Sequence, residues 1–180
     1  IEADEYKGSF LNYHPEAILI TNIDREHLDY YKNLSNVKKS FLRFMDNLNP
    51  HGILVLNNDD KPLASLASKL KNKKSYLPAG RQVWYSLQDE KHVKQIKKVL
   101  QIFGIHNLTN TLGAFKLAKS FGIKEETILK AISKYHGAWR RMEYKGKFSA
   151  EGGSSFGGQI PVYDDYGHHP TEIRATLSAL

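Results

Sequence analysis

The segment from Asp164 to Pro170 brings together residue types that readily do chemistry. Its order is D-D-Y-G-H-H-P, with two acids, a glycine and two adjacent histidines. Histidine titrates near neutral pH, and a neighbouring carboxylate can orient it, bind a metal ion or accept a ribose hydroxyl. Residues 160–163 are largely apolar and Pro170 can begin a helix, so a polar strand-to-helix turn is predicted. Adjacent histidines are also common in solvated turns, and the pattern alone leaves both interpretations open.

Carboxylates are concentrated near the start of the chain, at Glu2, Asp4 and Glu5. Mg²⁺ prefers hard oxygen ligands, commonly one or two carboxylates completed by water and substrate phosphates. His27 lies further on, in a polar stretch that holds more acids. The pattern fits a magnesium site, and it fits equally an acidic turn with an unrelated loop histidine.

A third group of polar residues stands where a helix is predicted to begin, at His106, Asn107 and Asn110. An asparagine amide both donates and accepts hydrogen bonds, which suits the mixed edge of adenine, and an imidazole can stack on the base. Asparagine at a helix start is also a common N-cap. Arg140 and Arg141 follow a loop, and a guanidinium can donate paired hydrogen bonds to phosphate.

These clusters occur in an order and at a spacing that match one enzyme family. Besides the tail, D-D-Y-G-H-H-P-T-E-I, the likeness rests on E-A-D-E-Y, T-N-I-D-R-E-H-L-D, G-I-H-N-L-T-N and G-A-W-R-R-M-E, which begin at residues 2, 21, 104 and 137. Each block alone is a moderate signal, and together they are specific. The chain resembles the Mur ligases of peptidoglycan synthesis, and the resemblance extends over its whole length.

The resemblance implies roles for individual residues. Glu2 and His27 are expected to contact a Mg²⁺ ion that bridges ATP and the substrate. Asp165 is expected to meet the ATP ribose, and His168 to lie near the phosphates or the substrate as a catalytic residue. The remaining nucleotide contacts are expected from His106, Asn107, Asn110 and Arg141, with Arg141 also catalytic and Arg140 as a second candidate.

The activity that the resemblance implies is ATP-dependent joining of L-alanine to the lactyl carboxylate of UDP-N-acetylmuramate, through an acyl phosphate. Several Mur ligases carry a carbamylated lysine at the place that Phe41 and Leu42 occupy here, with Lys38 and Lys39 only close by. The alanine-adding branch lacks this lysine, which favours it. A ligase that recycles a tripeptide shares E-A-D-E-Y and H-H-P-T, and it remains the alternative along with the other Mur ligases.

The resemblance also predicts the domain organisation. Residues 1–139 are expected to be the later part of a central ATP-binding domain, with a mostly parallel sheet and flanking helices. Residues 140–180 are expected to begin a Rossmann-like C-terminal domain that binds the amino acid. No G-x-x-x-x-G-K-S/T loop is present, and the resemblance places this phosphate-binding loop upstream of Ile1. The 180 residues alone are therefore expected to be inactive.

Composition agrees with a globular enzyme and decides little else. With 180 residues and 41% hydrophobic content, the chain can bury one sizeable core. It has no cysteine and no apolar run long enough for a membrane span, so a cytoplasmic protein without a membrane partner is expected. The net charge of +7 leaves a basic nucleic-acid-binding domain as a remote alternative. Much of this excess, however, lies at helical spacing in solvated faces, at lysines 69, 71, 73, 74, 91, 94, 97 and 98.

Apolar runs and helical patterns alternate along the chain. This alternation predicts a parallel sheet covered on both faces, in which ligands bind at the carboxyl ends of the strands. His27 and residues 57–60 are expected there. Residues 77–82 are interpreted as a surface insertion, and 151–158 as a hairpin-like loop between strands at 142–148 and 160–164. The other expected elements are strands at 17–21, 52–56 and 83–86, and helices at 35–49 (capped by Ser35), 61–70, 107–121, 124–135 and 171–180.

Overall fold

A three-stranded parallel sheet is the centre of the computed structural model, which describes residues 1–66, 82–148 and 159–180. The strands lie in the order β1 (Ala17–Ile20), β2 (Ile53–Asn57) and β3 (Gln82–Tyr85), so β1 and β3 form the two edges. The parallel α/β fold predicted from the sequence is confirmed, and the three strands lie within a residue of their expected bounds.

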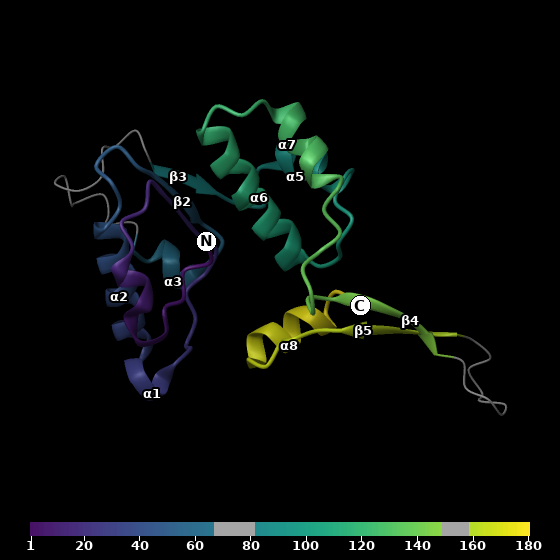
Figure 1. Cartoon of the computed structure of the whole chain (residues 1–180), viewed down its shortest axis with the longest axis horizontal. Coiled ribbons are helices and arrows are strands. Elements are labelled where there is room, and N and C mark those ends of the chain that lie inside the picture. Colours follow the sequence, from purple (N-terminus) through teal and green to yellow (C-terminus); the bar gives the residue numbers. More distant parts are fainter. Residues whose placement is uncertain (67–81, 149–158) are drawn as a thin grey trace.

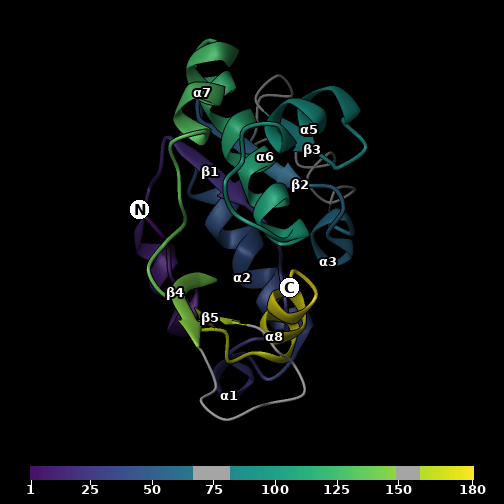
Figure 2. The ribbon, with the colours of Figure 1, turned by 90° about the vertical axis from the view of Figure 1, so that its right-hand side faces the viewer.

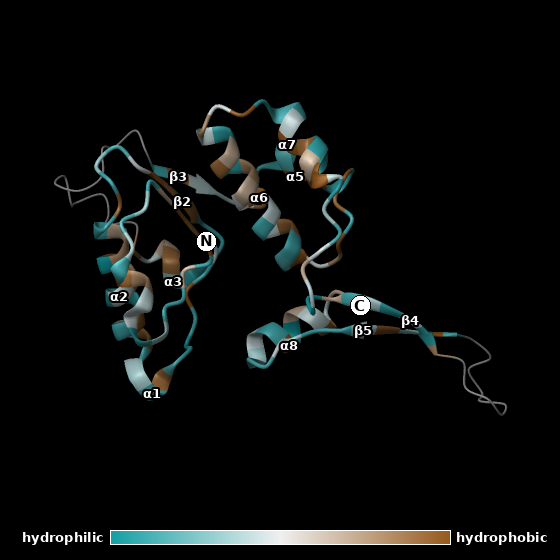
Figure 3. Ribbon diagram, viewed as in Figure 1, coloured by the Kyte–Doolittle hydropathy of each residue, from teal (hydrophilic) through white to brown (hydrophobic). Residues whose placement is uncertain are grey.

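Helices cover both faces of this sheet. Figure 1 shows the sheet between α2 (Leu34–Asp46) and α6 (Ile105–Ser120), and Figure 2 shows the same layers from the side. Side chains alternate across a strand, so the even-numbered residues of β2 pack on the α2 side and the odd-numbered ones on the α6 side. All of β2 is buried, and its residues before Asn57 lie at the hydrophobic end of the scale in Figure 3. Each buried aliphatic side chain stabilises the fold by about 1.5 to 3 kcal/mol.

A glycine allows α6 to lie close to the sheet. A Cβ added at Gly113 would stand 2.8 Å from the ring of Tyr85 and 3.0 Å from Cδ1 of Leu19. Any larger residue would therefore push α6 away from β1 and β3. The separation of this helix from the sheet determines where its first turn, with His106, stands above the strand ends.

Several helices differ from the sequence prediction in their bounds, and η1 and α1 were not predicted. The helix α2 begins at Leu34 and is capped by Asn33, whose side chain accepts a hydrogen bond from the Asn36 amide, and not by Ser35. The helical spacing of lysines 91, 94, 97 and 98 is confirmed by a helix at Glu90–Lys97, α5, whose bounds were not predicted. The expected helix at 61–70 is described as α3 (Lys61–Ala64), and its later part lies outside the described residues. The other short elements are η1 (Tyr6–Asn12), α1 (Leu28–Tyr31) and α7 (Glu125–Ile132).

The last part of the chain forms a separate hairpin and helix beside the strand ends (Figure 1). β4 (Glu143–Phe148) pairs antiparallel with β5 (Ile160–Asp164), as predicted. Pro170 is the first residue of α8 (Pro170–Leu177), which confirms the predicted strand-to-helix turn. The insertion expected at 77–82 falls, except for Gln82, outside the described residues, as does the loop at 151–158. No described helix combines the length and apolar character needed to cross a bilayer.

Candidate functional site

A polar cleft of about 660 Å³ lies between the strand ends and the C-terminal segment. One wall comes from the loop after β1 and from Asp60 after β2, and another from the first turns of α6. The segment that leads into β4 and the helix α8 complete it. Six of the residues singled out in the sequence line this cleft, namely Glu2, His106, Asn107, Asn110, Arg141 and Asp165.

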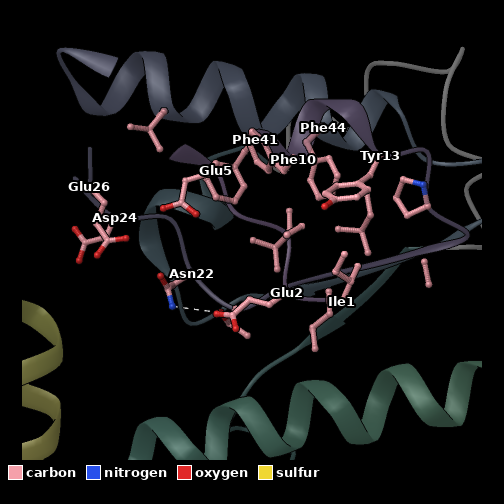
Figure 4. Close-up of a pocket in the computed structure, with 18 of the residues that line it drawn as sticks. Ile1, Glu2, Glu5, Phe10, Tyr13, Asn22, Asp24, Glu26, Phe41 and Phe44 are labelled. Carbon is pink, nitrogen blue, oxygen red and sulfur yellow. Dashed lines mark hydrogen bonds between the residues drawn. The ribbon is translucent and has the colours of Figure 1, made fainter. Parts of the chain in front are cut away.

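A second groove, of about 680 Å³, runs along β1 and shares part of its lining with the first. Figure 4 shows aromatic rings, including Phe10, Phe41 and Phe44, on one side of this groove. Asp24 and Glu26 lie together at its other end, and both also line the first cleft. The two hollows therefore meet at an acidic strip after β1.

The first turn of α6 presents His106 and Asn107 to the cleft. The helix is capped by Gly104, whose φ of 98° disfavours other residues, and a Cβ added there would stand 2.6 Å from Cε1 of the His106 ring. Burial lowers the pKa of His106; Asp165 nearby opposes this shift and the Arg141 cation adds to it. Asn107 is not the cap, but its amide donates to the Phe103 carbonyl at 2.5 Å. His106 is therefore favoured in its neutral form at the cleft wall.

The two arginines have different surroundings. Arg141 lines the cleft, and its guanidinium lies 3.6 Å from a carboxylate oxygen of Glu172. Arg140 instead lies 3.6 Å from Asp164 and stacks over Tyr166, with 5.0 Å between the guanidinium carbon and the ring centroid. Of the two arginines, Arg141 is the one that lines the cleft.

Asp165 is engaged by the backbone on both of its carboxylate oxygens. The Met142 amide donates to Oδ2 at 2.9 Å, and the Gly167 amide donates to Oδ1 at 2.7 Å. Asp165 thus ties the turn after β5 to the segment that leads into β4. It also contributes to the cleft wall, beside His106 and Arg141.

The two adjacent histidines point to different places. His168, the one singled out in the sequence, does not line the cleft, and its side chain is 71% exposed. His169 lines the cleft and caps α8, because its Nδ1 accepts from the Thr171 amide at 3.3 Å while Glu172 accepts from the His169 amide. The signal that could have identified His169 is its position directly before Pro170, since proline favours the residue after an N-cap.

His27 is brought together with Glu5 and Asp4, and not with Glu2. One ligand atom from each of the three residues lies within 4.8 Å of the others, and His27 Nε2 is 3.2 Å from a carboxylate oxygen of Glu5. The Tyr31 hydroxyl donates to the Glu5 carbonyl and so holds this segment against α1, which ends at Tyr31. Glu2 lines both hollows nearby. The donor set of two carboxylates and an imidazole fits a divalent cation.

Negative charge accumulates beside this group. Burial raises the pKa of Glu26, and the carboxylates of Glu5 and Glu172 raise it further, while His169 opposes the shift. Sequence analysis did not single out Glu26 or Glu172. Repulsion among these carboxylates would be relieved by a bound cation, which is a second property that suits a metal site.

Residues 57–60 lie at the strand ends as predicted, but their contacts are structural. The Asn57 amide donates to the Thr21 carbonyl at 2.9 Å. Asp59 accepts from the Ser86 hydroxyl at 2.6 Å and from the Leu87 amide at 2.7 Å. Asp60 caps α3 and accepts from the Ile23 amide at 3.3 Å. These bonds hold the three loops that form the base of the site.

Fold and cleft together define an α/β protein with a polar cleft at the carboxyl ends of parallel strands, covered by a separate C-terminal segment. Residues 2–118 match the family model described as the Mur ligase middle domain. The chain belongs to the Mur ligase family, as its sequence motifs predicted.

Sequence comparison gives similar proteins named UDP-N-acetylmuramate–L-alanine ligase. The protein of that name from Aquifex aeolicus is 39% identical over 195 residues, covering 99% of this chain and 40% of the relative. The one from Caldicellulosiruptor saccharolyticus is 39% identical over 196 residues, covering 100% of this chain and 41% of the relative. This chain therefore spans about 40% of the length of these relatives.

Solved structures support the same fold. MurF from Acinetobacter baumannii superposes with a TM-score of 0.65 at 17% identity, over 96% of this chain and 38% of that protein. A murein peptide ligase from Psychrobacter arcticus gives a TM-score of 0.59 at 21% identity, over 94% and 35% respectively. At these identities the likeness concerns the fold alone.

Proposed function

We propose that this chain is part of an ATP-dependent ligase that joins L-alanine to UDP-N-acetylmuramate in peptidoglycan precursor synthesis. The observation that carries the proposal is that six residues expected to bind the metal ion or the nucleotide line one cleft, although they come from four separate parts of the chain. The names of the relatives at 39% identity supply the two substrates. The cytoplasm is the proposed compartment, because both ATP and the nucleotide sugar are soluble anions.

The nucleotide end of the proposed site is the first turn of α6. We assign His106, Asn107 and Asn110 to the adenine, since a neutral imidazole can stack on a base and amides match its hydrogen-bonding edge. The support is the lowered pKa of His106 and the position of all three at the cleft. Asp165 is assigned to the ribose, a role additional to its two backbone hydrogen bonds.

We assign His27 as a ligand of Mg²⁺, with Glu5 and Asp4 beside it and Glu2 as a further ligand from the cleft wall. The clustering of His27 with two carboxylates supports the first part of this assignment. A bound divalent ion would supply positive charge to the phosphoryl oxygens. The assignment of Glu2 rests on family resemblance and on its position at both hollows.

A carboxylate is a poor acyl donor, so the proposed reaction has two steps. A lactyl carboxylate oxygen attacks the γ-phosphorus of ATP, the bond to the bridging oxygen breaks, and ADP leaves. The neutral amine of L-alanine then attacks the acyl carbon, the nitrogen loses a proton, and inorganic phosphate departs with the C–O electron pair. We assign Arg141 to neutralise phosphoryl oxygens during the first step.

His168 is assigned to the reacting phosphate, which requires a rearrangement because its side chain is outside the cleft. Covering of the cleft by the C-terminal segment would exclude water that would otherwise hydrolyse the acyl phosphate. We propose a domain boundary near residue 140, where the chain passes from α7 through residues 137–142 into β4.

The test is substrate-dependent ADP release by the natural full-length protein, followed by the mass of the product. Release should require ATP, UDP-N-acetylmuramate and L-alanine together, and the product should gain one alanine residue. Turnover with a muropeptide-type tripeptide and not with L-alanine would replace this proposal with the recycling ligase.

The metal assignment is tested by titrating Mn²⁺ and following its free EPR signal. His27→Ala and Glu5→Gln should each weaken Mn²⁺ binding about tenfold or more, since each removes a ligand or its partner. Asp29→Asn, which alters an exposed acid of α1, is the matched control. Unchanged Mn²⁺ affinity in both the His27 and the Glu5 variants would show that this cluster is not the metal site. A separate variant, Glu2→Gln, tests whether the ion also contacts the cleft wall.

A further inference from the structure

The helix α8 crosses the cleft and is held at both ends. At its first turn, the Thr171 hydroxyl donates to Oδ2 of Asp24 at 2.7 Å, and the two residues are 147 positions apart in the sequence. Just after its last turn, Ala179 lies so close to Gly104 that a Cβ on the glycine would be 3.0 Å away. The face between these ends, with Thr171, Glu172, Ala175 and Thr176, lines the cleft.

Asp24 is well suited to hold the first of these ends. Its Oδ1 accepts from the Arg25 amide at 2.7 Å, which orients the carboxylate, and its Oδ2 also lies 3.9 Å from Nδ1 of His169. Burial opposes ionisation of Asp24, but the hydrogen bond from Thr171 and the Arg25 amide outweigh it and lower its pKa. The acceptor is therefore charged at neutral pH.

The donor is held as firmly as the acceptor. His169 and Glu172 form a reciprocal capping box at the start of α8, which makes the first helical turn rigid. Thr171 lies inside this box, and its backbone amide donates to His169. The direction of its hydroxyl is thus determined by the turn that carries the H-H-P-T motif.

The segment that leads from α7 to the β4–β5 hairpin and α8 contains two residues with unusual backbone angles. Arg140 and Met142 have φ values of 53° and 52°, in the left-handed region that non-glycine residues rarely occupy. Both residues are bonded to the turn after β5, since the Tyr166 amide donates to the Arg140 carbonyl at 2.8 Å and the Met142 amide to Asp165. The turn and the hairpin therefore form one unit, whose position over the cleft depends on contacts such as Asp24–Thr171.

We propose that Asp24 is a positioning residue, which holds α8 across the cleft through Thr171 and so sets the width of the proposed nucleotide site. The effect of Asp24 on catalysis rests on the proposed ligase function. Its effect on the position of α8 is independent of that function. Asp24 acts here through Thr171 and makes no contact with reacting atoms.

The position of α8 can be measured as the distance between two nitroxide spin labels, by electron spin resonance. The labels are attached at Lys39→Cys on α2 and Arg174→Cys on α8, because these 180 residues contain no native cysteine. Asp24→Ala and Thr171→Val should each broaden the distance distribution or shift it to longer values. The double variant should add little, because both changes break the same bond. Thr171→Ser keeps the hydroxyl and should retain the original distribution, as should Asp29→Ala.

Distributions that match the unaltered protein in both single variants would overturn the proposal, as would a Thr171→Ser variant that behaves like Thr171→Val. In steady-state assays of the full-length protein, the single variants should raise the Michaelis constant for ATP about two- to tenfold, the value of one net hydrogen bond. If the label distances shift in the variants but the full-length protein shows no alanine-dependent turnover, the positioning role of Asp24 is supported and the proposed reaction is refuted.

Discussion

His106 is the residue whose surroundings are most unlike those of an ordinary surface histidine. Its Nδ1 is buried without a hydrogen-bond partner among the described residues, and Asp165 and Arg141 act on its charge in opposite directions. A buried polar atom without a partner is uncommon in a folded protein and costs stability. Burying a charged ring here would cost more, which agrees with the lowered pKa of His106.

The effect of these charges on the pKa of His106 can be measured by NMR, from the chemical shifts of its ring protons as a function of pH. The pKa should fall below the usual value of about 6.5. Arg141→Gln should raise the pKa because it removes a cation, and Asp165→Asn should lower it because it removes an anion. An unchanged pKa in both variants would mean that neither group lies near the ring in solution.

A lowered histidine pKa also affects stability. In the window between the two pKa values the folded state binds fewer protons than the unfolded state, so stability falls as the pH drops towards and below the unfolded pKa of about 6.5. The His106→Gln variant should therefore lose less stability between pH 7 and pH 5 than the unaltered protein. Urea unfolding at the two pH values measures the difference, and parallel losses would contradict a lowered pKa.

Asp165 is expected to have both a structural and a ligand-binding effect. Asp165→Ala removes the acceptor of the Met142 and Gly167 amides, so both amides should exchange hydrogen faster in NMR or mass-spectrometric experiments. In the full-length protein it should raise the Michaelis constant for ATP more than that for UDP-N-acetylmuramate, by roughly ten- to a hundredfold if a charged hydrogen bond is lost. Asp164→Ala, which alters the contact with Arg140, is the control. Faster exchange with unchanged kinetics would restrict Asp165 to its structural role.

At the scale of elements, three helices are joined by a polar network on the α6 side of the sheet. Asp89 caps α5 and lies 2.5 Å from the Lys116 ammonium of α6 and 2.6 Å from His92 Nδ1. Glu125, the first residue of α7, lies 3.4 Å from Nε2 of the same buried histidine. The network fixes α5 and α7 against α6, and so supports the helix that carries His106.

Removing Asp89 should loosen this network. Burial opposes its ionisation, but hydrogen bonds from Lys116 and His92 hold the pKa of Asp89 well below its usual range. Its contribution to stability is therefore present above the unfolded pKa of about 3.9 and is lost as the pH falls below it. Asp89→Ala should cost about 2 kcal/mol at pH 7 in urea unfolding, and less at pH 3. Glu90→Ala, an exposed neighbour, should cost little, and equal losses in the two variants would contradict the network.

The sequence was sufficient for the strands and the longer helices, because apolar runs and helical periodicity are local. It failed for the cap of α2, since both Asn33 and Ser35 can cap a helix and only the extended backbone of Asn33 decides. It indicated α5 only through the spacing of its lysines and gave no bounds, because the helix is short and half of its residues are charged. The grouping of His27 with Glu5 depends on how residues 6–12 turn back, with φ of 52° at Lys7 and 75° at Gly8, and such a turn has no clear sequence signal.

At the scale of the whole molecule, several basic side chains are held in ion pairs, which makes them less available to an external polyanion. Lys116 and Lys119 are paired with Asp89 and Glu125, and Lys91 lies 3.9 Å from Glu125. We therefore expect only weak binding to DNA or RNA, which should vanish at about 200 mM salt, as electrostatic contacts to phosphate do. Fluorescence anisotropy with a labelled oligonucleotide measures it. Tight binding that persists at this salt concentration would revive the nucleic-acid alternative.

The exposed edge of the sheet has a consequence for the behaviour of this chain at high concentration. Within the part of the chain that the structure describes, β1 pairs with β2 and with no second strand, although its sequence, A-I-L-I, is that of a central strand. Backbone groups along such an edge can template pairing with another molecule, and a groove leaves room beside it. Concentrated preparations of these 180 residues should therefore aggregate edge to edge unless a further strand, from the same polypeptide or added as a peptide, covers β1.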